Sequence, residues 1–157
     1  MFTCVVPEYG TITLHHFVSD FTGTLSVDGA LLPGVREGLQ KLAELVQPHV
    51  LTSDTFGSVR QEVAGIDCTL HILSGGDNHA ARKQEYIRTL GADGVIALGN
   101  GNNDRLMLET ARVGVAVCLA EGCAIKALQA ADILVSSPLD AFDLLFSPNR
   151  LKATLRR

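Results

Sequence analysis

Three short apolar runs of this 157-residue chain are followed by polar side chains that could carry chemistry, and a lysine lies in a later helical segment. These residues are Asp20 after HHFVS, Thr52 and Ser53 after PHVL, Asn100, Asn103 and Asp104 after VIALG, and Lys83. A carboxylate can act as a nucleophile, and Mg²⁺ usually binds one or two carboxylates together with waters and substrate phosphate. An ammonium group neutralises charge on phosphate oxygens. Together these residue types predict a site for a phosphoryl group and Mg²⁺.

The apolar pattern predicts alternating strands and helices that would position these groups. Val35, Leu39 and Leu42 recur at helical spacing, whereas VIAL and VGVAV are continuous apolar runs, typical of strands buried on both faces. We expect two strands around a turn at 7–10, the second within TITLHHFV, and a hairpin in the Gly-rich segment 21–34. Later strands are expected at 49–52, 69–73, 94–99, 113–117 and 132–136, and helices at 34–46, 54–64, 79–90, 103–111, 121–130 and 138–146.

Strands that alternate with helices predict an α/β fold with a three-layer, Rossmann-like and mostly parallel sheet. The N-terminal strands would add a small β-hairpin, and residues 1–157 would form a single domain, because no linker or repeat divides the chain. Ligands of such sheets bind outside the carboxyl ends of the strands, where the polar clusters stand. The turn after Asp20, which contains Gly23, can also present backbone N–H groups to an anion.

The composition excludes several classes of partner. Hydrophobic residues make up 46% of the chain and charged residues 19%, which fits a globular fold. No apolar run is long enough to span a membrane, and the N-terminus lacks a signal-peptide pattern. The formal net charge of −4 argues against a nucleic-acid or anionic membrane surface, apart from the basic tail 151–157. The four cysteines form no zinc-binding pattern, so we expect reduced thiols in a cytoplasmic protein.

Four motifs, in this order, resemble those of a known family. DFTGTL (20–25), LTSDT (51–55), Lys83 and GNGNND (99–104) look like the motifs of the haloacid dehalogenase superfamily. More narrowly, they resemble the phosphorylation domain of P-type ATPases, whose signatures are DKTGT, TGD, a lysine and GDGxND. The resemblance extends from about residue 12 to 146. It implies no cap and no nucleotide-binding domain, because the chain between the first two motifs holds only a hairpin and a helix.

The resemblance implies a role for each motif residue. Asp20 would be the nucleophile that forms an aspartyl-phosphate, and it would also bind Mg²⁺. Lys83 would neutralise charge between Asp20 and the phosphate, as electrostatic stabilisation requires. Thr52 would donate a hydrogen bond to a phosphoryl oxygen, with Ser53 and Gly23 as further phosphate-binding residues. The remaining Mg²⁺ ligands would be the Thr22 backbone carbonyl, Asn100 and Asp104, the last either directly or through water, with Asn103 orienting them.

Two positions depart from the pattern in ways that bear on activity. Asn100 stands where the family has the first Asp of GDGxND, and an amide is a weaker ligand for Mg²⁺ than a carboxylate. Thr22 stands where phosphatases of the superfamily usually place a second Asp as general acid and base. Threonine has no useful pKa for that role, so we expect a slowly hydrolysed phosphoenzyme. Phe21 replaces the lysine of DKTGT and leaves the catalytic positions intact.

Plainer interpretations of the same residues stay open. Asp20 could be a turn residue, Thr52 or Ser53 could cap the next helix, and Lys83 could be a solvated lysine near a helix start. Asp54 is expected to cap a helix rather than to bind metal. Ordinary structural or surface roles are also expected for His15 and His16, for Glu121 near a helix dipole, and for the tail residues Arg150, Lys152, Arg156 and Arg157.

We therefore predict a Mg²⁺-dependent phosphohydrolase that acts through an aspartyl-phosphate on Asp20. The alternative is a non-catalytic or very slow phosphate-binding module that serves as a phospho-switch, which Asn100 and Thr22 favour. The substrate would be a small phosphate ester or anhydride, or a phosphorylated macromolecule able to reach an open site. Because no cap would exclude water, a homo-oligomer is one way to close the site.

Overall fold

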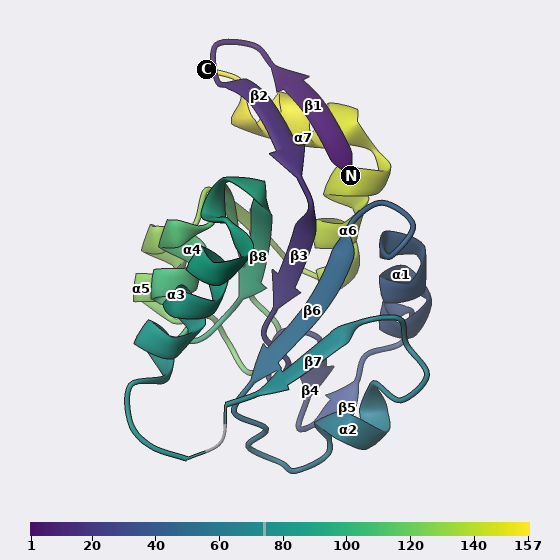
Figure 1. The fold of residues 1–157 in the computed structure, drawn as a ribbon, viewed down its shortest axis with the longest axis vertical. Coiled ribbons are helices and arrows are strands. Elements are labelled where there is room, and N and C mark those ends of the chain that lie inside the picture. The colour runs from purple at the N-terminus through teal and green to yellow at the C-terminus, as the bar shows by residue number, and fades with distance from the viewer. Residues whose placement is uncertain (74) are drawn as a thin grey trace.

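The computed structural model describes residues 1–73 and 75–157 and is built on a six-stranded sheet in the order β10-β9-β8-β3-β6-β7 (Figure 1). Every pairing within this sheet is parallel. Strands β8 and β9 are buried along their whole length, as their continuous apolar sequences predict. The strands are β3 (His16–Ser19), β6 (Gln47–Thr52), β7 (Thr69–Ile72), β8 (Val95–Gly99), β9 (Val113–Val117) and β10 (Ile133–Val135).

Helices cover both faces of the sheet and complete the predicted three-layer α/β fold (Figure 1). One face carries a core that includes Ile87 and Met107, and the other carries a core that includes Leu39 and Phe142. In the part of the chain that the structure describes, no helix is long and apolar enough to cross a membrane. The first face holds α3 (His79–Leu90), α4 (Arg105–Thr110) and α5 (Ile125–Ala130), and the second holds α1 (Val35–Leu42) and α6 (Pro138–Phe146).

The predicted N-terminal hairpin forms a small sheet of its own. Strands β1 (Phe2–Val6) and β2 (Gly10–Leu14) pair antiparallel around the expected turn. The expectation of one continuous strand through TITLHHFV was wrong, because the chain bends at His15. The N–H of His15 donates to the carbonyl of Gly94, and the carbonyl of His15 accepts from the N–H of Gln47. These bonds redirect the chain into the main sheet, where β3 lies between β6 and β8.

The basic tail is part of the fold rather than a solvated end. Residues Pro148–Leu155 form α7, which packs against β1 and buries Leu151 and Leu155 (Figure 1). Arg150 forms an ion pair of 2.6 Å with Asp143. The apolar face of α7 thus covers the hairpin, while Arg150, Arg156 and Arg157 are exposed, in agreement with the surface role expected for them.

Two helices begin later than the sequence predicts. The helix expected from residue 54 is only α2 (Val59–Glu62), and the helix expected from residue 121 begins at Ile125. Both starts are delayed by left-handed backbone: Asp54 has a φ of 53° and Gly122 a φ of 84°. A residue in that region cannot belong to a right-handed helix. The hairpin expected after Asp20 is present as β4 (Ser26–Val27) and β5 (Ala30–Leu31).

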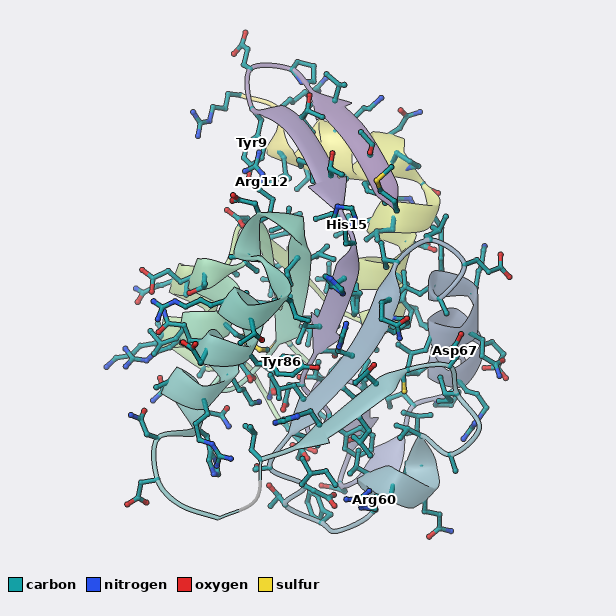
Figure 2. The ribbon with its side chains drawn as sticks, in the orientation of Figure 1. Tyr9, His15, Arg60, Asp67, Tyr86 and Arg112 are labelled. Atoms are coloured by element: carbon teal, nitrogen blue, oxygen red, sulfur yellow. The ribbon has the colours of Figure 1, made fainter. Side chains whose placement is uncertain are left out.

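A chain of hydrogen bonds joins β3 and β6 to α3 on the first face of the sheet. His16 Nδ1 lies 3.0 Å from His49 Nε2, and His49 Nδ1 lies 2.9 Å from the hydroxyl of Tyr86, which is labelled in Figure 2. Burial and the charge of His16 lower the pKa of His49 to about 4, and burial and the charge of His15 lower the pKa of His16. The two facing rings are therefore stable only when neutral, in the hydrogen-bonded role expected for His16.

This arrangement predicts acid sensitivity through His49. Its pKa in the folded chain lies below the value of 6.5 expected for the unfolded chain. The stability it contributes is thus present above pH 6.5 and lost as the pH falls through about 4. Urea unfolding from about pH 7 to pH 4 should show a smaller loss of stability for His49→Gln than for the wild type. The partly exposed His79, changed to Gln, is the control and should follow the wild-type profile; equal slopes for all three would contradict the assignment.

Candidate active site

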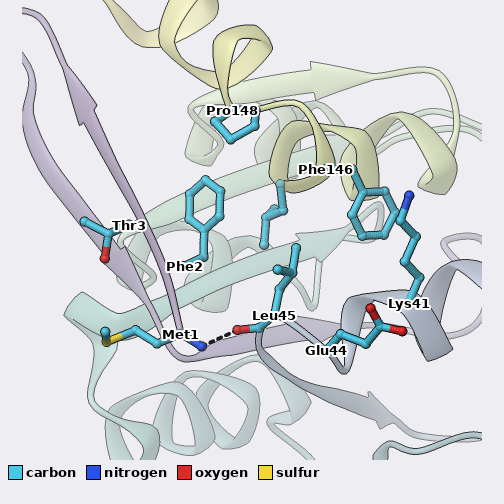
Figure 3. Close-up of a pocket in the computed structure, with 9 residues that line it drawn as sticks. Met1, Phe2, Thr3, Lys41, Glu44, Leu45, Phe146 and Pro148 are labelled. Atoms are coloured by element: carbon cyan, nitrogen blue, oxygen red, sulfur yellow. Dashed lines mark hydrogen bonds between the residues drawn. The ribbon is translucent and has the colours of Figure 1, made fainter.

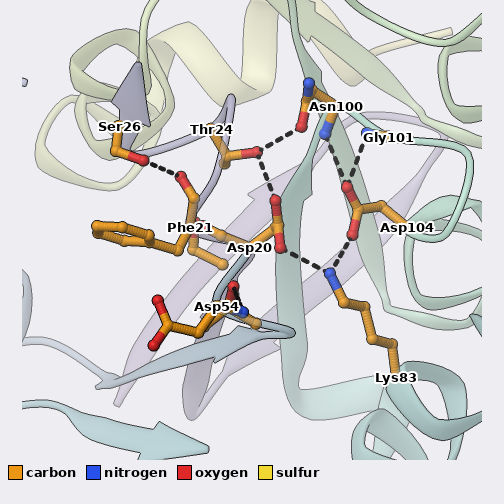
Figure 4. Close-up of polar contacts among 11 residues, drawn as sticks. Asp20, Phe21, Thr24, Ser26, Asp54, Lys83, Asn100, Gly101 and Asp104 are labelled. Carbon is orange, nitrogen blue, oxygen red and sulfur yellow. Dashed lines mark hydrogen bonds and ion pairs between the residues drawn. The ribbon is translucent and has the colours of Figure 1, made fainter. Parts of the chain in front are cut away.

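Segments far apart in the sequence meet at the carboxyl ends of the central strands (Figure 4). Asp20 directly follows β3, and its N–H donates to the carbonyl of Leu98 in β8 at 3.0 Å. Asp104 lies in the loop after β8, and Lys83 reaches the same place from the beginning of α3. Thr52 ends β6, the other neighbour of β3. Neighbouring parallel strands end at the same edge of a sheet, so the convergence predicted from the sequence is present in the structure.

Lys83 joins the two carboxylates (Figure 4). Its Nζ donates to Asp20 Oδ1 at 2.7 Å and to Asp104 Oδ1 at 2.6 Å. Lys83 and Asp104 have no exposed surface, and Asp20 is 6% exposed. A charge this deeply buried is very costly unless it is paired. The interpretation of Lys83 as a solvated surface lysine, and that of Asp20 as a simple turn residue, are therefore both excluded.

The buried cluster holds two carboxylates and one ammonium group, and this excess of negative charge affects the pKa values of its members. Burial and the negative charge of Asp104 raise the pKa of Asp20 to about 6, against the opposing effect of Lys83. Burial by itself would lower the pKa of Lys83, but the charges and hydrogen bonds of Asp104 and Asp20 outweigh it and raise that pKa. Lys83 is therefore a permanent cation, while Asp20 holds its negative charge at an energetic cost. A strained carboxylate of this kind is typical of functional sites.

Both carboxylate oxygens of Asp104 accept hydrogen bonds. Its second oxygen, Oδ2, accepts from the backbone N–H of Asn100 at 3.0 Å and of Gly101 at 2.8 Å. Gly99 makes this position possible, because a Cβ there would lie 2.6 Å from the Asp104 Cβ. With both oxygens engaged, Asp104 holds Lys83 and the loop in place. A direct role as a metal ligand, one of two that the resemblance implied, would require it to give up one of these bonds.

Asn100 bridges two parts of the site through the two ends of its amide. Its Oδ1 accepts from the Thr24 hydroxyl at 3.1 Å, and its Nδ2 donates to the carbonyl of Gly122 at 3.0 Å. The same hydroxyl lies 3.4 Å from Asp20 Oδ2. A carboxylate at position 100 could not donate to Gly122, so the amide is integrated into this structure. Sequence reasoning assigned no role to Thr24, although DFTGTL contains it.

The turn after Asp20 is shaped by Gly23. Its φ of +73° suits glycine, and a Cβ there would lie 2.5 Å from Asn100 Nδ2. The Gly23 N–H donates to the Ser26 carbonyl, so this group is directed into the turn rather than toward an anion. Phosphate binding by Gly23 stays a prediction, whereas its role in letting Asn100 approach follows from the geometry. Thr22 is half-buried in the same turn.

Thr52, at the end of β6, has a hydroxyl group that can still donate a hydrogen bond. The Thr52 side chain is buried, and its oxygen accepts from the N–H of Asp54 at 3.0 Å, which leaves the hydroxyl proton to donate elsewhere. Asp54 Oδ1 accepts from the N–H of Val59, the first residue of α2. Asp54 thus satisfies the helix start, as expected, although from outside the cap position. Two other predicted residues, Ser53 and Asn103, are half-buried at this edge.

The predicted metal ligands are all oxygen atoms, which suits a hard cation such as Mg²⁺. Asp20 Oδ2 and Asn100 Oδ1 both lie within hydrogen-bond distance of the Thr24 hydroxyl, which places two of the predicted ligand oxygens near one another. Among the described residues, no group of three or more His, Cys, Asp or Glu side chains is arranged to hold a metal. A cation here would depend on Asp20 Oδ2, whose contact with the Thr24 hydroxyl is long at 3.4 Å, on an amide, a backbone carbonyl and the substrate. The residues fit Mg²⁺ as a weak site.

Glu121 lies at the rim of this site and not at a helix start. Its Oε1 accepts from the N–H of Asp28 in the β4–β5 turn at 2.8 Å. Its Oε2 lies 2.9 Å from the point that a Cβ on Gly23 would occupy. The expectation of a helix-dipole contact was wrong, because α5 begins only at Ile125. Glu121 instead ties the loop after β9 to the hairpin beside Asp20.

Removing the central cation should destabilise the protein. Lys83→Met leaves the carboxylates of Asp20 and Asp104 buried without their partner, and the expected loss is about 3–5 kcal/mol of unfolding free energy. Urea unfolding in the presence of a chelator near neutral pH measures it.

A double-mutant cycle makes the test specific. Asp20→Asn by itself should stabilise the chelated protein by about 1–3 kcal/mol at neutral pH, because the pKa of about 6 reflects the cost of ionising Asp20. Combined with Lys83→Met, it should recover part of the loss. Strict additivity of the two changes would show that the ion pair of Lys83 with Asp20 contributes nothing.

Comparison with known sequences gives one informative relative. No family model matches the chain. An uncharacterized protein of Methanocaldococcus jannaschii is 50% identical over 62 residues, which are 40% of this chain and 67% of that protein.

Comparison with solved structures places the fold. The 3-deoxy-D-manno-octulosonate 8-phosphate phosphatase of Moraxella catarrhalis, solved with magnesium, phosphate and KDO, aligns over 91% of this chain and 94% of its own, with a TM-score of 0.70 and 17% identity. The cobalt-bound phosphatase of the same name from Haemophilus influenzae has a TM-score of 0.70 and 13% identity, over 92% and 94% of the two chains.

One part of a membrane pump also has a structure similar to that of this chain. A zinc-transporting PIB-type ATPase in the E2.Pi state aligns over 80% of this chain but only 20% of its own length, with a TM-score of 0.62 and 20% identity. A putative HAD superfamily hydrolase from Legionella pneumophila aligns over 90% of this chain and 86% of its own, with a TM-score of 0.67 and 18% identity. At these identities the likeness concerns the fold. The chain thus has the fold of the haloacid dehalogenase (HAD) superfamily, as its four motifs implied.

Proposed function

We propose that the protein is a Mg²⁺-dependent phosphohydrolase that transfers a phosphoryl group to Asp20 and then to water. The observation that carries the proposal is the buried Lys83, which bridges Asp20 and Asp104 at the ligand-binding edge of a HAD fold. The similar phosphatase from Moraxella catarrhalis holds magnesium and phosphate, which supports the same ligands here.

The residues divide the work of the first step between them. A carboxylate oxygen of Asp20 forms a bond to phosphorus as the bond from phosphorus to the leaving group breaks. Lys83 has three N–H donors and uses two of them on the carboxylates, so the third can donate to a phosphoryl oxygen. The Thr52 hydroxyl donates to another. Mg²⁺, when bound by Asp20, the Thr22 carbonyl and Asn100, supplies positive charge to the phosphoryl oxygens.

The second step returns Asp20 to its carboxylate. Water attacks phosphorus, the acyl-phosphate bond breaks, and inorganic phosphate leaves. Thr22 cannot act as a general acid or base for either step. We infer a preference for substrates whose leaving group needs no proton, such as acyl and aryl phosphates, and a slow second step. The proposed substrate is a small phosphorylated compound or a phosphorylated macromolecule, since no cap would restrict access to the site.

A cytoplasmic location and a homo-oligomer that covers the site belong to the same proposal. Light scattering measures the oligomeric state.

Because a slow second step would prolong the phosphorylated state of Asp20, a phospho-switch is the other candidate function. Asn100 and Thr22 favour it, because a weakly bound cation and the lack of a general base both prolong the phosphoenzyme. Acetyl phosphate with Mg²⁺ discriminates between the two: a long-lived label without phosphate release indicates a switch, whereas repeated release indicates a phosphatase.

Hydrolysis of p-nitrophenyl phosphate tests the proposed activity. Turnover should require Mg²⁺, disappear with a chelator and fall at least about 1,000-fold in Asp20→Asn, because the nucleophile is lost. The matched control is Asp67→Asn, since Asp67 is exposed in the loop before β7, at the opposite edge of the sheet (Figure 2). Undiminished turnover in Asp20→Asn would refute the assignment.

Restoring the missing acid should broaden the substrate range. Thr22→Asp places a carboxyl group two residues after the nucleophile, where it could protonate a leaving group. Hydrolysis of an alkyl phosphate should rise by about 10-fold or more relative to p-nitrophenyl phosphate, which needs no proton. Thr55→Asp, in an exposed loop at the same edge, is the control for the added charge. If both variants leave the ratio of the two rates unchanged, proton transfer is not what limits the reaction.

A further inference from the structure

Two cysteines, Cys118 and Cys123, flank the tight turn that follows β9. The N–H of Gly122 donates to the carbonyl of Leu119 at 2.9 Å, and these two residues form an antiparallel bridge. Cys118 and Cys123 are the next residues outward on either side of the bridge. In an antiparallel pair, side chains directly opposite each other lie on the same face. The register therefore sets the two thiols opposite each other.

The packing of the flanking residues agrees with this register. Val115 and Val117 of β9 belong to the core beneath α1 and α6, so the alternation along the chain directs Cys118 toward the face of α4 and α5. Cys123 packs against the core of that same face. Burial, and next the charge of Cys118, raise the pKa of Cys123, which fits two neighbouring thiols.

The backbone pattern also suits a covalent bond. The N–H of Cys118 donates to the carbonyl of Val135 in β10, on the side away from Cys123. The two cysteines thus occupy the position of a non-hydrogen-bonded pair, for which Cα atoms lie about 4.5 Å apart. Disulfides span Cα separations of about 4.4–6.8 Å, so a pair in this position is compatible with a disulfide. Both thiols are free, and Cys118 is exposed to solvent.

We propose that Cys118 and Cys123 are a reversible oxidation site, at which a peroxide closes an intramolecular disulfide. The exposed Cys118 thiolate attacks the peroxide, breaks the O–O bond and becomes a sulfenic acid as hydroxide leaves. The Cys123 sulfur then attacks the Cys118 sulfur, and the sulfenic oxygen leaves as water. The two thiols lose two electrons in total, the peroxide accepts them, and a dithiol reductant reverses the change.

The disulfide would secure a turn that holds the candidate active site. The carbonyl of Gly122 accepts from Asn100 Nδ2, and the N–H of Ala124 donates to the carbonyl of Asn100. Glu121 binds the hairpin beside Asp20 through the N–H of Asp28. Because the cysteines already face each other, oxidation should preserve these contacts and stabilise the fold. Only this consequence for the site rests on the proposed function; formation of the disulfide does not.

Peptide mass mapping after peroxide treatment tests the proposal on the full chain. Trypsin cuts after Arg112 and Lys126, so Cys118 and Cys123 lie in one peptide that contains no other cysteine. After a brief exposure to hydrogen peroxide, this peptide should lose about 2 Da, and the loss should be reversed by dithiothreitol. Cleavage after Glu121 should leave its two halves joined. The melting temperature of the oxidised protein should rise by about 2–6 °C.

Single substitutions separate this pair from the other thiols. Cys118→Ser, at an exposed position, and Cys123→Ser should each abolish the mass loss, whereas Cys68→Ser should leave it unchanged. A crosslink that maps to Cys4 or Cys68, a dimer linked by disulfides, or four thiols that survive peroxide would overturn the proposal. None of these readouts depends on phosphatase activity, so failure of the proposed function would leave this result interpretable.

Discussion

The site depends on one buried cation held between two carboxylates. Lys83 lies without solvent between Asp20 and Asp104, and its two short hydrogen bonds are what make its burial tolerable. Burial, and next the negative charge of Asp104, raise the pKa of Asp20 against the opposing effect of Lys83. A bound cation would add positive charge beside Asp20 and would lower the free-energy cost of its ionised form. Stability and reactivity are opposed at this point, as is usual for functional sites.

The surrounding polar network explains why the loop after β8 has its particular sequence. Gly99 lets Asp104 pack against the strand end, and two N–H groups hold the second oxygen of Asp104. Asn100 needs an acceptor end for Thr24 and a donor end for Gly122, which an amide has and a carboxylate lacks. The amide of residue 100 is therefore integrated into the structure through both of its ends.

Much of the architecture follows from patterns that act locally. Strands buried on both faces must be continuously apolar, so VIALG and VGVAV identified β8 and β9, and the alternation with helices identified the parallel sheet. Errors arose where single residues leave the regular backbone. Asp tolerates the left-handed region better than most residues, but the residue types alone do not predict that Asp54 adopts it or that the chain bends at His15, because both depend on contacts with Val59, Gly94 and Gln47.

The sequence by itself determined which chemical groups are available and in what order: a carboxylate, a hydroxyl, a lysine and an Asn/Asp cluster, each beside a strand end or a helix start. Only the tertiary structure decided that Lys83 pairs with both carboxylates, that Thr24 joins Asp20 to Asn100, and that Glu121 meets the hairpin. The physical reason is register. Contacts between residues far apart along the chain depend on how parallel strands align and where each ends, and that alignment is set by the packing of the whole core.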